Sequence, residues 1–375
     1  MVRLRGVTWD HPRGLDPMVA TAEVYAQTHP GVEIVWDKRP LQAFADFPIH
    51  RLARDYDLIV IDHPHVGAVS QEDCLVPLDT IGRDRELAQL ASRSLGASHA
   101  SYEYSGHQWA LAIDAAAQVS AYRSDLIMPP PSTWSEVIAF AQAGRVLWPL
   151  KPVDALMSFF TLTANRGTPC AASGDELIRR VDGLAVLEAM QALARLVPHE
   201  CLAMNPIQVL DRMSMEDAFV YCPLLFGYSN YSREGFRPRV VRFTNIPSLG
   251  TLGPVGSTLG GAGLAISAWT VAPEAAADYA FWVASDECQK GLYFASGGQP
   301  ANAAAWDDPT TNAVCHDYFR STRATLDRSW LRPRYPGYLE FQDRGGELIN
   351  SFLAGNLSAE DTMRHLETTY RNTRP

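Results

Sequence analysis

A four-residue run without a polar side chain constrains the fold of this chain more than any other segment. Leu58-Ile59-Val60-Ile61 is shorter than a helix needs, and none of its side chains suits a solvent-facing position. Such a run is typical of a central strand in a parallel sheet that is covered on both faces. It ends at Asp62-His63-Pro64-His65, so polar side chains follow the predicted strand directly.

Strand and helix signals alternate in the segments around that run. Val2–Trp9 is predicted as a strand that ends at Asp10-His11-Pro12-Arg13-Gly14, and a helix is predicted over 17–28. Residues 109–113 have the pattern of a further strand that ends at Asp114. This alternation predicts an α/β fold built on mainly parallel sheets with flanking helices.

The length of the chain indicates two domains, since 375 residues exceed the roughly 150 of an ordinary domain. No composition break divides the sequence, so we expect it to cross between two lobes more than once. We expect 1–112 with about 263–310 in the first lobe, and about 113–262 with 311–375 in the second. The tail from about 310 is predicted as helical and able to pack on both lobes.

Charge and cysteine usage argue against several classes of partner. With 32 Lys and Arg against 42 Asp and Glu, the net charge is −10, whereas nucleic-acid binding normally needs a basic surface. No window reaches the roughly 18 apolar residues of a membrane span. The cysteines form no CxxC pair, so buried free thiols are expected rather than a zinc or redox site. They are Cys74, Cys170, Cys201, Cys222, Cys288 and Cys315.

The N-terminus bears on the compartment. MVRLRGVTWDHPRG lacks the apolar region of a signal peptide and enters a predicted strand almost at once. As the sequence stands we expect a cytoplasmic protein, or a periplasmic one if a leader has been trimmed. We expect a monomer without a cofactor.

Polar residues follow three of the predicted strands and form the core of the candidate site. Ligands of open α/β sheets bind beyond the carboxyl ends of the strands. The alternative is that these polar residues only cap loops, because Asp next to Pro often hydrogen-bonds the local backbone. His63 and His65 are two residues apart and point to opposite sides of an extended loop, so no metal site is expected. The strand-end residues are Asp10, His11, Arg13, Asp62, His63 and Asp114.

Three blocks of sequence, in order and spacing, resemble the family 1 extracellular solute-binding proteins, the maltose-binding-like group. The blocks are Tyr104-Ser105-Gly106-His107-Gln108-Trp109-Ala110-Leu111, Ala121-Tyr122-Arg123-Ser124-Asp125-Leu126 and Pro130-Pro131-Ser132-Thr133-Trp134-Ser135-Glu136. Gly260-Gly261-Ala262-Gly263 is similar to the start of the family's glycine-rich return strand, and Ser296-Gly297-Gly298-Gln299-Pro300 to its expected loop. Arg123 and Ser124 depart from the family's usual Asn and Lys.

The resemblance implies a two-lobed periplasmic-binding-protein fold of type II that closes by hinge motion on a small ligand. It implies a non-enzyme that serves an ABC importer and binds a sugar-like, otherwise polyhydroxylated or cationic solute between its lobes. It adds Tyr228 and Trp269 as stacking candidates. The glycine cluster around Gly261 indicates a hinge or a close backbone approach to the ligand. The alternative is a cytoplasmic enzyme or metabolite-binding protein on the same scaffold that uses the strand-end Asp and His side chains. No Gly-x-Ser-x-Gly elbow supports nucleophilic catalysis.

Overall fold

The computed structural model describes residues 1–41, 47–172 and 176–375. In the described chain, two compact units form. Unit 1 comprises Met1–Ala116, Gly260–Thr311 and Arg334–Pro336, and unit 2 comprises Ala117–Leu259, Asn312–Pro333 and Gly337–Pro375. The sequence led us to expect crossings near 113, 262 and 310, but it gave no hint of the short excursion at Arg334–Pro336. That the two units act as lobes of a hinge stays a prediction.

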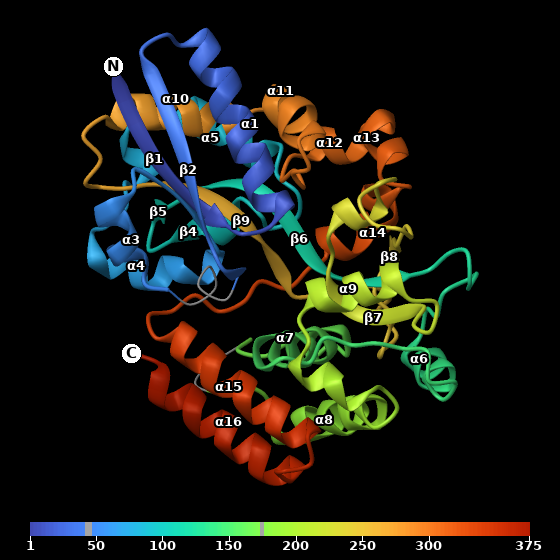
Figure 1. Cartoon of the computed structure of the whole chain (residues 1–375). Coiled ribbons are helices and arrows are strands. Elements are labelled where there is room, and N and C mark those ends of the chain that lie inside the picture. The colour runs from blue at the N-terminus through green and yellow to red at the C-terminus, as the bar shows by residue number, and fades with distance from the viewer. Residues whose placement is uncertain (42–46, 173–175) are drawn as a thin grey trace. The chain divides into compact units, whose positions relative to one another are not determined.

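The sheet of unit 1 contains parallel and antiparallel pairs. β1 (Val2–Trp9) pairs in parallel with β2 (Val32–Arg39) along its whole length (Figure 1). It also pairs in parallel with β3 (Leu58–Ile61), at Gly6 and Val7. β9 (Leu259–Ile266) runs antiparallel to β3. The predicted strands at 2–9 and 58–61 are confirmed with the expected bounds.

Alternate residues of β3 enter two different hydrophobic clusters. Leu58 and Val60 pack with α1 (Pro12–Thr28) and α10 (Pro273–Ala284). Ile59 and Ile61 pack with α3 (Ile49–Asp55) and α4 (Val66–Glu72). All four side chains are fully buried, so the prediction of a strand covered on both faces is confirmed.

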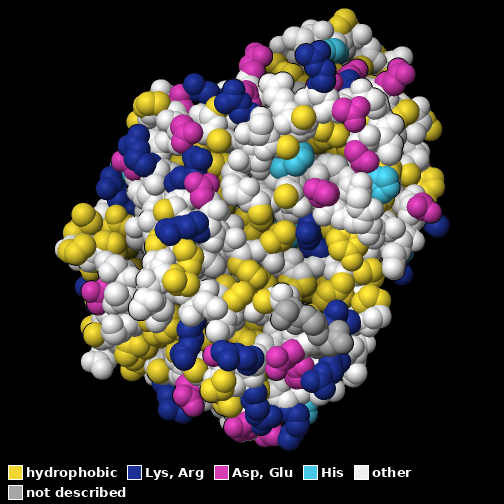
Figure 2. Space-filling model, turned by 180° about the vertical axis from the view of Figure 1, so that it is seen from behind, with side chains coloured by type: hydrophobic (Ala, Val, Ile, Leu, Met, Phe, Trp, Pro, Cys, Tyr) yellow, Lys and Arg dark blue, Asp and Glu magenta, His cyan; other side chains and the backbone are white. Residues whose placement is uncertain are grey.

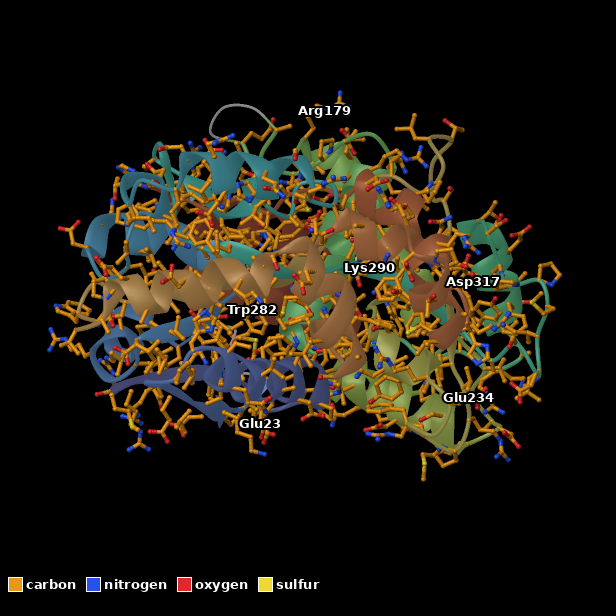
Figure 3. All side chains as sticks on the ribbon, turned by 90° about the horizontal axis from the view of Figure 1, so that it is seen from above. Glu23, Arg179, Glu234, Trp282, Lys290 and Asp317 are labelled. Atoms are coloured by element: carbon orange, nitrogen blue, oxygen red, sulfur yellow. The ribbon has the colours of Figure 1, made fainter. Side chains whose placement is uncertain are left out.

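Aromatic side chains fasten α1 to α10. Tyr25 lies flat on His29, with ring centroids 3.8 Å apart, and meets Tyr279 edge-on at 5.2 Å. Glu23 points away from this contact, on the outer side of α1 (Figure 3). The buried face of α1 therefore sets the position of the first β-α turn.

Unit 2 corrects one part of the fold prediction. β6 (Leu111–Tyr122) pairs there with β7 (Tyr221–Phe226) and β8 (Arg242–Thr244), and both pairs are antiparallel. The expectation of a mainly parallel sheet in the second lobe is therefore wrong. Apolar patterning reports how deeply a strand is buried, but it does not encode the direction of its neighbour.

A nearly all-buried helix forms the core of unit 2. α7 (Pro152–Asn165) packs against α8 (Arg180–Ala194) and α15 (Tyr338–Leu353), and α15 packs against α16 (Ala359–Thr373), as Figure 1 shows. The predicted capping box of Thr133 and Glu136 opens the helix α6 (Trp134–Ala141). The other α-helices and strands of the described residues are α5 (Asp84–Ser92), β4 (Glu103–Tyr104), β5 (His107–Gln108), α9 (Pro206–Met215), α11 (Asp286–Cys288), α12 (Ala303–Asp307), α13 (Pro309–Val314) and α14 (Tyr318–Asp327).

The six cysteines are free and buried, which confirms the expectation of buried thiols. Burial raises the pKa of the Cys170 thiol to about 12, so this thiol stays protonated at neutral pH.

None of the described helices combines the length and apolarity needed to cross a membrane. Figure 2 shows side chains of both charges interspersed over the visible face.

Candidate functional site

The strand directions in unit 1 bring several predicted site residues to one edge of the sheet. β1 and β3 are parallel, so Asp10 and Asp62 follow their strands at the same end. β9 is antiparallel to β3 and its Gly263 lies opposite Ile61, so Gly261 belongs to this end as well. We call this end of the sheet the carboxyl edge.

The turn after β1 is organised by His11. Its ring Nδ1 accepts a hydrogen bond from the Arg13 backbone N–H at 3.0 Å, which makes His11 the N-cap of α1. The helix consequently begins at Pro12 rather than at the predicted residue 17, because proline is favourable in the first helical turn. An accepting Nδ1 carries no proton, so the ring is neutral with its proton on Nε2. Asp10 is exposed and pairs with Lys38 of β2 at 2.8 Å.

Arg13 and Asp114 form a buried, bidentate ion pair. Arg13 Nε donates to Asp114 Oδ2 at 2.7 Å and Nη2 donates to Oδ1 at 2.5 Å. The two side chains are only 5% and 1% exposed. Burial raises the pKa of the Asp114 carboxyl, and the charge and hydrogen bonds of Arg13 oppose that rise.

Asp114 lies inside β6 and not at a strand end, so that expectation is corrected. The sequence predicts an end to the strand at Asp114 because a charged residue appears there. The strand continues because Arg13 compensates the carboxylate and the following alanines are buried. Asp114 is nevertheless adjacent to the carboxyl edge, since a Cβ on Gly261 would lie 2.3 Å from its carbonyl oxygen.

Asp62 caps the short 3-10 turn η1 (His63–His65). Its Oδ1 accepts the His63 backbone N–H at 2.9 Å and lies 3.3 Å from His63 Nδ1. The His63 ring is fully buried and meets the Tyr102 ring edge-on, with centroids 6.3 Å apart. His65 is buried too. The capping that we weighed as the alternative therefore does occur at Asp62 and His11.

Gly261 serves a contact between strands. Its φ of +114° and the proximity of the Asp114 carbonyl both require a residue without a Cβ. Gln299, which the sequence did not single out as a site residue, supports the same stretch of β6. The side-chain Nε2 of Gln299 donates to the Ala115 backbone carbonyl at 2.8 Å. The backbone carbonyl of Gln299 accepts from the Ala115 N–H at 3.2 Å. The loop block Ser296-Gly297-Gly298-Gln299-Pro300 was the signal that could have revealed it.

Of the two aromatic candidates, Trp269 is not at the carboxyl edge, and Tyr228 belongs to the other unit. Trp269 follows the last residues of β9, and Ile266 pairs with Leu58, so Trp269 lies at the opposite end of the sheet. It is 47% exposed, with the Arg54 guanidinium 5.8 Å from its ring centroid. Tyr228 belongs to unit 2, where it is buried and meets Tyr231 edge-on at 6.5 Å.

At the carboxyl edge the carboxylates of Asp10 and Asp62 reach the surface, whereas the imidazoles of His11 and His63 are buried. Within residues 1–41, 47–172 and 176–375, no three His, Cys, Asp or Glu side chains are grouped so as to hold a metal ion. Arg123, the departure from the family pattern, is buried in unit 2. It bonds Asp125 at 2.7 Å and Asp217 at 2.9 Å, so its role there is structural.

Comparison with known sequences gives a short match. No family model matches the chain. The maltotriose-binding protein of Pyrococcus abyssi is 28% identical over 133 residues, which is 35% of this chain. The match spans 28% of the length of that relative, well under a third.

Solved structures match nearly the whole chain. Maltose-bound MalE3 of T. maritima gives a TM-score of 0.84 at 17% identity and covers 99% of this chain and 100% of its own. A ribitol-bound ABC solute-binding protein from Agrobacterium radiobacter K84 gives 0.79 at 21% identity, with 99% and 98% covered. An α-D-tagatose-bound one from Thermotoga lettingae gives 0.84 at 14%, with both chains fully covered. The chain therefore has the fold of the maltose-binding-like solute-binding proteins, which is the group that its sequence blocks resemble.

Proposed function

We propose that this protein binds an uncharged, polyhydroxylated small molecule at the carboxyl edge, as the solute-binding component of an ABC importer. The fold supports this proposal, as do the maltotriose, maltose, ribitol and tagatose named for its relatives. The permease partner follows from the same likeness. The observation that favours an uncharged ligand is the pairing of charged side chains at this edge.

Cationic and anionic groups at the carboxyl edge compensate one another. Arg13 pairs with Asp114, Lys38 pairs with Asp10, and the Asp62 carboxylate accepts a backbone N–H. A charged ligand would have to compete for one of these partners, and breaking a buried pair is costly. Hydroxyl groups donate and accept at once, so a polyol adds hydrogen bonds to such a surface without displacing a charge. We therefore favour the polyhydroxylated ligand over the cationic one.

The enzyme alternative has less support. Acid–base catalysis needs a group that is free to take up or release a proton near the substrate. His11 uses its Nδ1 to cap α1, and Asp114 is held by both arms of Arg13. The matched structures named above are binding proteins. Binding without chemistry is accordingly the reading that we propose.

A thermal-shift screen tests the proposal. The panel contains maltose, maltotriose, ribitol and tagatose, with gluconate as an anionic and glucosamine as a cationic control. A ligand at a hundredfold its Kd raises the melting temperature by on the order of 5 °C, because it binds only the folded state. We expect at least one neutral polyol to do so. A shift produced only by a charged control would contradict the proposal.

A further inference from the structure

A three-residue excursion of the chain lies directly beside the carboxyl edge. Arg334–Pro336 belongs to unit 1, whereas the residues before and after it belong to unit 2. We call Arg334–Pro336 the strap. Pro333 precedes it and Pro336 ends it, and the proline rings restrict the backbone at both positions. Such a segment needs specific contacts to hold it on unit 1.

The Arg334 side chain supplies the first of these contacts. Its Nη1 donates to the carbonyl oxygens of Ala100 and Ser101, at 2.9 Å each, and of Glu103 at 2.6 Å. These carbonyls surround the 3-10 turn η3 (Ala100–Tyr102). Hydrogen bonds from a charged donor are stronger than those between neutral groups, so Arg334 grips this turn firmly.

The strap backbone supplies the second contact. A Cβ placed on Gly67 would lie 1.7 Å from the Arg334 carbonyl oxygen and 2.7 Å from the Tyr335 carbonyl carbon. Only glycine leaves room for the strap at this point. Gly67 is in the first turn of α4, two residues after His65, so the strap rests on the helix that continues the candidate turn.

The segments that the strap contacts, η3 and α4, both adjoin η1, the turn that Asp62 caps. The turn gripped by Arg334 carries Tyr102, whose hydroxyl donates to the Ile61 carbonyl at 3.3 Å. The Tyr102 ring also meets the His63 ring edge-on. One support of η1 thus runs through Tyr102 to Ile61 and His63, and the other through Gly67 to His65.

We propose that Arg334 is a positioning residue for the candidate site, which fixes η1 from both sides by holding the strap against η3 and α4. The inference deepens the proposed function, since the turn it positions is part of the proposed ligand site. Its first test needs no ligand.

Hydrogen exchange of the ligand-free, full-length protein is the test. In Arg334→Gln we expect amide exchange to rise about tenfold or more over residues 61–72, as well as in the strap, because charge-assisted bonds to three carbonyls are lost. Arg334→Lys should keep part of the protection, since an ammonium retains the charge and three donors. Arg85→Gln is the matched control, because Arg85 is an exposed unit 1 residue.

Gly67→Ala tests the same inference from the opposite side. This variant keeps Arg334 but fills the space in which the strap backbone contacts Gly67. Alanine itself is favourable in a helix, so α4 should be retained. We expect faster exchange in the strap and over 61–66 in this variant as well. If Arg334→Gln accelerates exchange only within the strap, with 61–72 as in the unmodified protein, Arg334 is a local anchor and the inference is wrong.

A titration with maltotriose separates this inference from the proposed function. If maltotriose binds, Arg334→Gln should weaken its binding about tenfold while Arg85→Gln leaves it unchanged. Faster exchange over 61–72 without binding of any polyol would support the positioning role and contradict the proposed function. Unchanged maltotriose affinity in a variant whose exchange over 61–72 has risen would show that the turn does not serve binding, and would overturn the role of Arg334 in the site.

Discussion

Arg13 and Asp114 lie 101 positions apart in the sequence, and their side chains meet in a bidentate, almost fully buried ion pair. The pair joins the first turn of α1 to β6. It therefore connects the β1–α1 segment to the strand on which the chain leaves unit 1. It also removes both charges from the set that a ligand could use. We therefore expect Asp114 and Arg13 to shape the carboxyl edge, and their predicted role as ligand contacts stays a prediction.

The pair predicts the stability of variants at either position. Asp114→Asn leaves the Arg13 guanidinium buried without its counter-charge, which should cost about 3–5 kcal/mol in the free energy of unfolding. Replacing both partners, as in Arg13→Met with Asp114→Leu, should recover much of that loss, because two apolar side chains need no compensation. Urea unfolding of the single and the double variant measures these values. A loss under 1 kcal/mol in Asp114→Asn would contradict the account of the pair.

The cap of α1 gives a second prediction. His11→Ala removes the acceptor for the Arg13 N–H and should lower the free energy of unfolding by about 0.5–2 kcal/mol. His11→Asn supplies a side-chain oxygen that is favourable at an N-cap and should restore most of the stability. Equal destabilisation in both variants would show that the ring matters for its packing and not for its cap.

How far the site could be predicted is clearest at these two residues. The sequence placed His11 and Arg13 at the end of a strand, because the apolar run before them is unmistakable. It did not predict that His11 caps a helix, since histidine is not among the usual N-cap residues. Nor did it pair Arg13 with Asp114, because nothing local in the sequence specifies a contact over 101 positions.

Elsewhere in the fold, features with a local sequence signal were likewise predictable, and features that depend on distant contacts were not. The strand at 58–61 and the capping box at Thr133 were predictable because both signals lie within a few residues. The antiparallel neighbours of β6 and the strap at Arg334 were not, because each depends on how distant segments meet. Trp269 was chosen for its place after a glycine-rich strand, but the direction of β9 puts it at the far end of the sheet.

Gly261 allows strain and steric exclusion to be separated. Gly261→Ala places a Cβ 2.3 Å from the Asp114 carbonyl at a φ of +114°, whereas Gly31→Ala meets no neighbour within 4 Å at a φ of +110°. We expect Gly31→Ala to cost about 1 kcal/mol from backbone strain alone, and Gly261→Ala to cost clearly more. Thermal unfolding of the two variants measures the difference. Similar costs would mean that β6 yields without penalty at this contact.

Asp154 of unit 2 predicts a dependence of stability on pH. Burial raises the pKa of its carboxyl to about 7, and Lys151 opposes the rise. The folded protein holds this proton more tightly than the unfolded chain does, so its contribution is complete below about pH 4 and is lost as pH rises to 7. The loss is on the order of 4 kcal/mol. In Asp154→Asn that part of the slope should vanish from unfolding curves measured between pH 4 and 8, and an unchanged slope would contradict the assignment.

Calorimetric titration of Asp62 variants tests the central claim most directly. The ligand is the neutral polyol that gives the largest thermal shift, and Asp84→Ala, at an exposed residue of α5, is the control. The account predicts that Asp62→Ala weakens binding about tenfold to a hundredfold, as expected for loss of a charged hydrogen-bond partner, while Asp84→Ala binds as the unmodified protein does. Unchanged affinity in a folded Asp62→Ala protein would contradict a ligand site at the carboxyl edge.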